Sequence, residues 1–185
     1  GRADFNHGRT RQFGVETLKG CDVIVFLTQD AVVASPDSIR SLIEAFADEG
    51  VGMAYGRQLP HTWARPLGAH ARMFNYPPQS QVRTLSDVHR IGIKAAFASN
   101  SVAAYRREAL QAVGGFPSNV ILGEDTIVAA RLLLAGWKVT YCAEAVVRHS
   151  HDYSLLQEFR RYFDVGVMHS REGWLIERFG KPEGE

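Results

Sequence analysis

The stretch of sequence that decides the fold is Ile24-Val25-Phe26-Leu27-Thr28-Gln29-Asp30-Ala31. Four apolar residues, two of them β-branched, run into a single carboxylate, and this pattern predicts a buried parallel strand that ends near Asp30. Open α/β sheets bind ligands at the carboxyl edge of their strands. Asp30 is therefore a candidate ligand for a divalent cation, because Mg²⁺ and Mn²⁺ prefer oxygen donors. The alternative is that Asp30 only caps the following turn.

The composition is typical of a single globular domain. The 185 residues are 45% hydrophobic with a net charge of +1, and no long basic run is present, so nucleic acid is not an expected partner. Cys21 and Cys142 lack metal-type spacing, and we expect reduced thiols in a cytoplasmic protein. No apolar run reaches the length of a membrane span. Any membrane contact is expected to be peripheral, at the inner face of the plasma membrane.

The first half of the chain predicts alternating helices and strands. We expect a helix over residues 10–18, a strand over 22–27, a helix after Pro36 and a strand over 51–55, as in a βαβ unit. Residues 56–94 lose this periodicity and contain four prolines, which predicts a long functional or mobile loop. Its aromatic and arginine side chains would suit a sugar or phosphate surface. The alternative is a solvated loop packed by its own side chains.

The second half predicts further strands over residues 96–105, 138–142 and 145–148. The last strand leads into His149-Ser150-His151, and the alternation of an extended chain places both histidines on one face, where they could bind a metal or a phosphate. Ordinary structural histidines are the alternative.

Two helices are expected between these strands. The first covers residues 107–113 and ends at Gly114-Gly115-Phe116-Pro117. The second begins at Glu124-Asp125 and ends at Gly136. Acidic side chains in a first helical turn are favoured by the helix dipole and the free amides whatever the function, so this pair also has a purely structural interpretation.

Residues 154–185 are predicted to form an amphipathic helical segment packed on a domain of residues 1–153, with interruptions near Gly166 and Gly173. A core-packed helix pair fits this pattern best. A partner-binding face and a shallow membrane-surface element remain alternatives.

As an ordered set, these motifs resemble those of the inverting family 2 glycosyltransferases of the GT-A fold, and among them the bacterial rhamnosyltransferase-type enzymes. The likeness covers about residues 6–172. Thr28-Gln29-Asp30 stands where the family has its Asp-x-Asp motif, with Asp30 matching the second Asp. Glu124-Asp125 matches the Glu-Asp motif, whose Asp is the catalytic base.

The resemblance implies an α/β fold with a mostly parallel, Rossmann-like GT-A sheet flanked by helices. It also implies an enzyme of bacterial polysaccharide synthesis, which moves a sugar such as rhamnose from a dTDP- or UDP-sugar to a hydroxyl of a saccharide or lipid-linked acceptor by a single inverting displacement. Asp125, with Glu124 beside it, would be the catalytic group. Asp30, His149 and His151 would hold Mg²⁺ or Mn²⁺. The implied substrate-binding residues are Thr28, Gln29, Asn100, Arg160 and Arg161.

The sequence departs from the family pattern at two places, and each departure leads to a further expectation. The family's first strands, which hold the nucleotide, precede the segment that residues 6–11 resemble, so we expect an N-terminally truncated donor site, no activity of this chain alone and self-association through the sheet edge. Residues 157–161 resemble the Gln-x-x-Arg-Trp motif of processive members, but Arg161 occupies the Trp position, which predicts a non-processive enzyme.

Two other functions stay open. The same cleft could belong to a catalytically silent nucleotide-sugar or carbohydrate-binding module, in which Asp125 only caps its helix. A small zinc-binding structural domain that uses Cys142, His149 and His151 is the third interpretation, although it has few ligands at suitable spacing.

Overall fold

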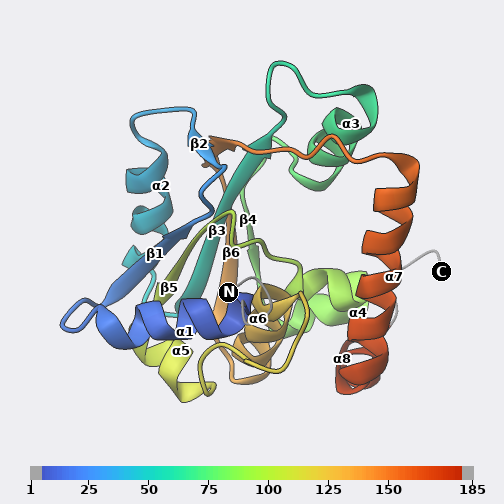
Figure 1. The fold of residues 1–185 in the computed structure, drawn as a ribbon. Helices are drawn as coiled ribbons and strands as arrows, with labels where there is room; N and C mark the ends of the chain where they lie inside the picture. The colour runs from blue at the N-terminus through green and yellow to red at the C-terminus, as the bar shows by residue number, and fades with distance from the viewer. Residues whose placement is uncertain (1–5, 181–185) are drawn as a thin grey trace.

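The computed structural model describes residues 6–180, in which a mixed sheet has helices on both sides (Figure 1). The strand order is β1-β5-β3-β6-β2, and β4 pairs with another part of β6. The strands are β1 (Val23–Leu27), β2 (Val32–Val33), β3 (Val51–Leu59), β4 (Gln81–Arg83), β5 (Val102–Arg106) and β6 (Lys138–Arg148). The helices are α1 (His7–Thr17), α2 (Ser38–Glu44), α3 (Pro66–Asn75), α4 (Val88–Ile91), α5 (Arg107–Ala112), α6 (Glu124–Leu134), α7 (Leu155–Arg171) and α8 (Trp174–Phe179).

The predicted α/β class is confirmed, but the strand directions differ from the mostly parallel sheet that we expected. Among the described strands, β3 and β6 form the one parallel pair. β5 runs antiparallel to both of its neighbours, β1 and β3, and the short strands β2 and β4 run antiparallel to β6. β1 is also not the buried parallel strand that its apolar run predicted, because it is an edge strand of the described sheet in which Ile24 is the one buried residue. An apolar run carries no information about the direction of a strand or its place in the sheet, which explains the error.

The central strands are buried on both faces, and successive side chains enter two different cores. Tyr55 of β3 and Tyr105 of β5 belong to the larger core, which includes most of α6. The preceding residue of each strand, Ala54 and Ala104, belongs to the smaller core, which also contains Leu42 of α2. Burying each large apolar side chain contributes about 1.5–3 kcal/mol, so packing on both faces holds the sheet in place.

Strand β6 is continuous, whereas the sequence predicted two strands separated near residues 143 and 144. The interruption is a bulge: Gly56 of β3 pairs with Cys142, and the next residue, Arg57, pairs with Val146. A side chain at Gly56 would overlap the backbone carbonyl of Ala145, so only glycine fits opposite the bulge.

The prediction of a long loop over residues 56–94 is wrong. β3 extends to Leu59, and α3, β4, α4 and two 3-10 turns follow within this range. The prolines suggested a loop, but Pro66 lies in the first turn of α3. An N–H group at this position has no partner within the helix, so its absence in proline does not destabilise α3. The remaining loop before α3 includes His61 and Trp63, whose rings stack with centroids 4.5 Å apart.

The C-terminal segment forms the amphipathic helices α7 and α8, and the parts of the two predicted domains at residues 1–5 and 181–185 lie outside the described residues. α7 passes through Gly166 without a break and ends before Gly173. α8 buries Leu175 and Phe179 in the larger core.

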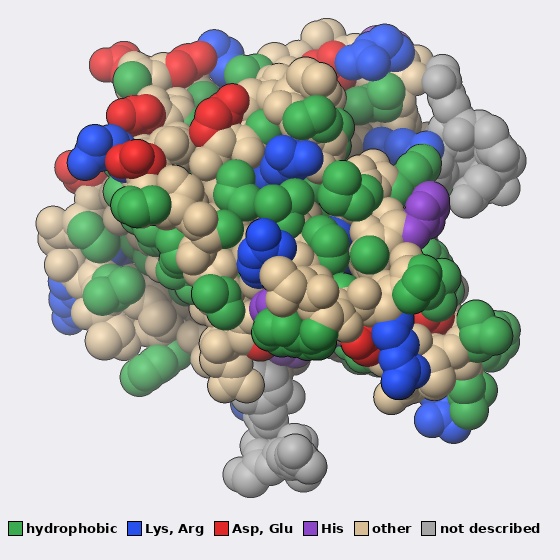
Figure 2. All heavy atoms as spheres, turned by 90° about the horizontal axis from the view of Figure 1, so that it is seen from above, with side chains coloured by type: hydrophobic (Ala, Val, Ile, Leu, Met, Phe, Trp, Pro, Cys, Tyr) green, Lys and Arg blue, Asp and Glu red, His purple; other side chains and the backbone are tan. Residues whose placement is uncertain are grey.

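The first half of α7 leaves an apolar face uncovered, with Leu155 79% and Phe159 68% exposed. Figure 2 shows further hydrophobic side chains on the top face of the molecule, the side on which α3 lies in Figure 1. Within residues 6–180, no helix has both the length and the apolar character needed to cross a bilayer.

Candidate active site and metal site

A cavity of about 540 Å³ brings together most of the predicted site residues. Its wall includes parts of α1, α3 and α7, the segment before β5, the start of α6 and the segment after β6. The predicted residues in this wall are Asn100, Glu124, Asp125, His149, His151 and Arg161.

Asp125 is held in the cavity wall by two backbone amides. Its Oδ1 accepts a hydrogen bond from the N–H of Thr126 (2.8 Å), and its Oδ2 accepts one from the N–H of Asn100 (3.1 Å). The N-cap of α6 is Gly123, so Asp125 is not the capping residue of this helix. Burial and the neighbouring Glu124 charge raise the pKa of Asp125 to about 6, although both amides oppose the shift. Asp125 is therefore a stronger base than an ordinary aspartate and is still ionised at neutral pH.

Glu124 is buried and is engaged by two partners. Its Oε1 lies 2.8 Å from Nη1 of Arg11 and accepts a hydrogen bond from Nδ2 of Asn100 (3.3 Å). The hydroxyl of Tyr105 donates to Oδ1 of Asn100 (2.6 Å), so both ends of the amide are fixed. Glu124 thereby orients Asn100, whose backbone holds Asp125.

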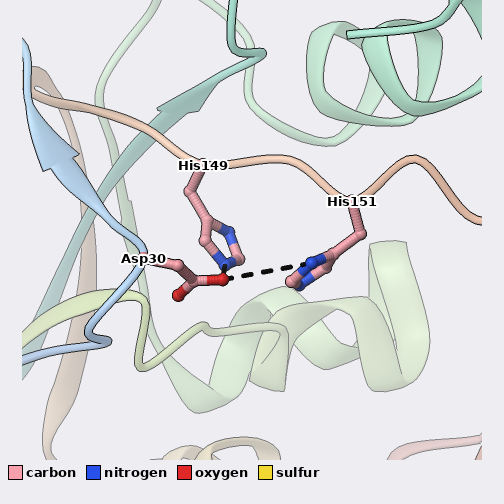
Figure 3. Close-up of side chains that lie close together, drawn as sticks. All are labelled: Asp30, His149 and His151. Atoms are coloured by element: carbon pink, nitrogen blue, oxygen red, sulfur yellow. Dashed lines mark ion pairs between the residues drawn. The ribbon is translucent and has the colours of Figure 1, made fainter.

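Asp30 and the two predicted histidines form a compact group (Figure 3). Oδ2 of Asp30 lies 3.3 Å from Nε2 of His149 and 4.0 Å from Nδ1 of His151. Asp30 is carried by the turn after β1, and both histidines come from the segment after β6. Candidate ligand atoms of the three side chains lie within 4.8 Å of one another.

The protonation of this group suits a cation. Burial lowers the pKa of His149 to about 4, against the opposing effect of Asp30, and burial also lowers the pKa of His151. Partial burial acts to raise the pKa of Asp30, but His149 and local hydrogen bonds outweigh it and leave the pKa below its ordinary value. At neutral pH the group therefore offers a carboxylate and two neutral imidazoles, the forms that bind metals.

Several predicted residues lie outside the cavity wall. Thr28 and Gln29 belong to the turn that carries Asp30, and Arg160 lies on the exposed side of α7. Cys142 packs in the smaller core and is absent from the group formed by the two histidines, so the zinc interpretation is wrong for the described residues.

Sequence reasoning missed Gln58 and assigned no site role to Arg11, and it considered Arg72 only as one of the loop arginines that would suit a sugar or phosphate surface. Arg11 and Arg72 lie in the cavity wall, and Gln58 contacts His149 from β3. Gln58 and Arg72 fell in the range expected to be a loop, and Arg11 belonged to a segment noted only for its family likeness. No local pattern marks Gln58, because its burial follows only from tertiary packing.

Comparison with known proteins decides the family. Residues 6–163 match the model described as "Glycosyltransferase like family 2". The chain belongs to this family. It is 50% identical over 182 residues to the O-antigen chain rhamnosyltransferase RfbN of Salmonella typhimurium, and 47% identical over 183 residues to the O-antigen chain rhamnosyltransferase WbaN of Salmonella anatum. These alignments cover 98% and 99% of the chain, which spans 58% of the length of each relative.

The fold is also that of solved glycosyltransferases. The chain superposes on the mannosyltransferase PcManGT of Pyrobaculum calidifontis, solved with GDP-Man and Mn²⁺, with a TM-score of 0.56 at 16% identity. The match covers 92% of this chain and 51% of the other. The predicted GT-A-type fold is confirmed.

Proposed function

We propose that this glycosyltransferase family 2 chain takes part in transferring a sugar, rhamnose in particular, from a nucleoside diphosphate donor to a hydroxyl of a saccharide or lipid-linked acceptor. The observation that carries the proposal is the wall of one cavity, which contains both the Asp125 carboxylate and the two histidines that face Asp30. The names of the relatives that are 47–50% identical support rhamnose as the sugar and O-antigen synthesis as the setting.

The chemistry is a single displacement. The acceptor oxygen forms a bond to the anomeric carbon, the bond from that carbon to the donor phosphate oxygen breaks, and its electron pair leaves with the diphosphate. Asp125 takes the proton of the attacking hydroxyl, a role that contributes about 10²–10⁴-fold in rate. Glu124 and Asn100 keep that carboxylate in place through the contacts described above.

Asp30, His149 and His151 would hold the metal ion. A set of one carboxylate and two imidazoles fits Mn²⁺ better than Mg²⁺, which prefers oxygen ligands and keeps several waters. When bound, such an ion neutralises negative charge on the leaving diphosphate. Arg161 and Arg72, which also lie in the cavity wall, suit the phosphate oxygens of the donor.

The proposed location is the cytoplasm, with peripheral contact at the inner face of the membrane. The uncovered apolar face at the start of α7 supports such a contact, because exposed aromatic and leucine side chains beside arginines suit a membrane surface.

The test is sugar transfer by the full-length protein with Mn²⁺ and either dTDP-rhamnose or a UDP-sugar, followed by mass spectrometry of a lipid-linked acceptor. We expect an acceptor product heavier by one deoxyhexose with dTDP-rhamnose. Calorimetric binding of the nucleotide without any product, across a panel of acceptors, would contradict the proposal and favour a silent binding module.

A further inference from the structure

Gln58 is a fully buried polar residue in β3, and its amide makes four polar contacts. Its Nε2 donates to the hydroxyls of Tyr76 (2.7 Å) and Ser99 (2.8 Å). Its Oε1 accepts from Nη1 of Arg72 (2.8 Å) and lies 2.9 Å from Nδ1 of His149. These contacts use both N–H groups and both lone pairs of the amide, and they offset the cost of burying it.

Arg72 determines the orientation of the Gln58 side-chain amide. A guanidinium group can only donate hydrogen bonds, so the atom of Gln58 that faces Arg72 must be the carbonyl oxygen. The reversed amide would set an N–H group against the cation. The hydroxyls of Tyr76 and Ser99 can donate or accept, and they adapt to the orientation that Arg72 imposes.

The fixed carbonyl determines where His149 carries its hydrogen. An acceptor faces each ring nitrogen of His149, but Oε1 of Gln58 lies 2.9 Å from Nδ1, whereas Oδ2 of Asp30 lies 3.3 Å from Nε2. The shorter contact favours the neutral imidazole that carries its N–H group at Nδ1. The hydroxyl of Ser101, 3.3 Å from the same nitrogen, can accept from it as well. The other ring nitrogen, Nε2, is then left with a lone pair.

That lone pair faces a second acceptor. Nε2 of His149 lies 3.3 Å from Oδ2 of Asp30, and no hydrogen is available between the two atoms in this tautomer. A divalent cation beside both atoms turns this repulsion into coordination, because each atom offers it an electron pair.

We propose that Gln58 is a positioning residue for the metal site, and that its carbonyl, locked by Arg72, holds His149 as the Nδ1–H tautomer so that Nε2 can bind a cation with Asp30. The functional consequence rests on the metal site proposed above. The tautomer itself does not depend on it and can be measured without metal.

The first experiment measures the tautomer in the metal-free protein. A two-dimensional multiple-bond ¹⁵N–¹H NMR spectrum distinguishes protonated from unprotonated ring nitrogens, and the His149 signals are those missing from a His149→Gln variant. We expect hydrogen at Nδ1 in the parent. Hydrogen at Nε2 in the parent would overturn the proposal, and this outcome requires no Gln58 variant to fold.

The second experiment compares two replacements of Gln58. Gln58→Met removes the acceptor, so the hydrogen should move to Nε2, where Asp30 accepts it, and Mn²⁺ affinity measured by electron paramagnetic resonance should fall about 10–100-fold. Gln58→Glu keeps acceptors toward Arg72 and His149, so it should retain the Nδ1–H tautomer and a Mn²⁺ affinity within about threefold of the parent. Gln111→Met, at an exposed position of α5, is the matched control and should change neither quantity.

The outcomes separate the two proposals. Retention of the Nδ1–H tautomer and of full Mn²⁺ affinity in Gln58→Met would overturn the role of Gln58. A parent that has the Nδ1–H tautomer but binds no Mn²⁺ would overturn the metal site instead, and with it the consequence drawn for Gln58.

Discussion

Replacing Asp125 by asparagine separates catalysis from stability in this protein. The amide has nearly the same shape as the carboxylate but cannot take a proton, so sugar transfer should fall by the full contribution of a general base, about 10²–10⁴-fold. In the parent, kcat/KM should decline as the pH falls below about 6, because the pKa of Asp125 is raised to about 6 and its protonated form cannot act as a base. The variant should lack this acidic limb.

The stability of the same variant follows from two opposing effects. The pKa of Asp125 is raised from 3.8 to about 6, and at about 1.4 kcal/mol per pH unit the ionised carboxylate lowers native stability by roughly 3 kcal/mol. Relative to neutral pH, this stability is fully present below pH 3.8, where the carboxyl group is protonated in both states, and it is lost as the pH rises through about 6. Asparagine removes the charge but leaves one of the two backbone amides without an acceptor, at a cost of about 1–3 kcal/mol. The effects nearly cancel, so the melting temperature at pH 7 should stay close to that of the parent.

The assay is initial-rate sugar transfer by the full-length protein between pH 5 and pH 8, beside thermal unfolding at pH 7, with Asp37→Asn as the control at an exposed carboxylate. A variant that keeps a third or more of the parent rate, or an acidic limb that survives the replacement, would refute the assignment of Asp125 as the base. Loss of activity together with a large drop in melting temperature would refute the argument that the two stability effects cancel.

Three further predictions concern the metal site, the ion pair between Arg11 and Glu124, and the edge of the sheet. Asp30→Ala should weaken Mn²⁺ binding in calorimetry without unfolding the protein, since this side chain is 47% exposed; unchanged affinity would exclude Asp30 as a ligand. Arg11→Met should lower the free energy of unfolding, measured in urea, by about 3–5 kcal/mol, because it leaves the buried Glu124 charge without its ion-pair partner. The control Arg40→Met breaks the exposed Arg40–Asp37 ion pair and should lower the free energy of unfolding by about 0–1 kcal/mol. Equal effects of the two arginine variants would contradict this reasoning. β1 lies at the edge of the described sheet, so sedimentation over a concentration series should detect self-association of this chain. A monomer at all concentrations would argue against pairing through this edge.

Local sequence patterns were sufficient to predict the strand and the helix that carry the candidate site residues. The apolar run before Asp30 predicted β1 within one residue, and the Glu124-Asp125 pair marked the start of α6. Alternation along an extended chain placed His149 and His151 together. Each of these inferences uses neighbours within a few positions, where the backbone geometry of a helix or strand fixes the relation between side chains.

Contacts between distant segments were decided only by the tertiary structure. Nothing local to β5 indicates that it runs antiparallel to both neighbours, since its apolar residues are buried whichever way it runs. The four contacts of Gln58 come from separate segments, so its amide gains a fixed orientation only when β3, α3 and the segment after β6 are packed together. The sequence alone indicated candidate side chains for chemistry at this site, and several of them meet in the cavity wall. Their orientation and protonation depend on burial and on partners that folding brings within hydrogen-bonding distance.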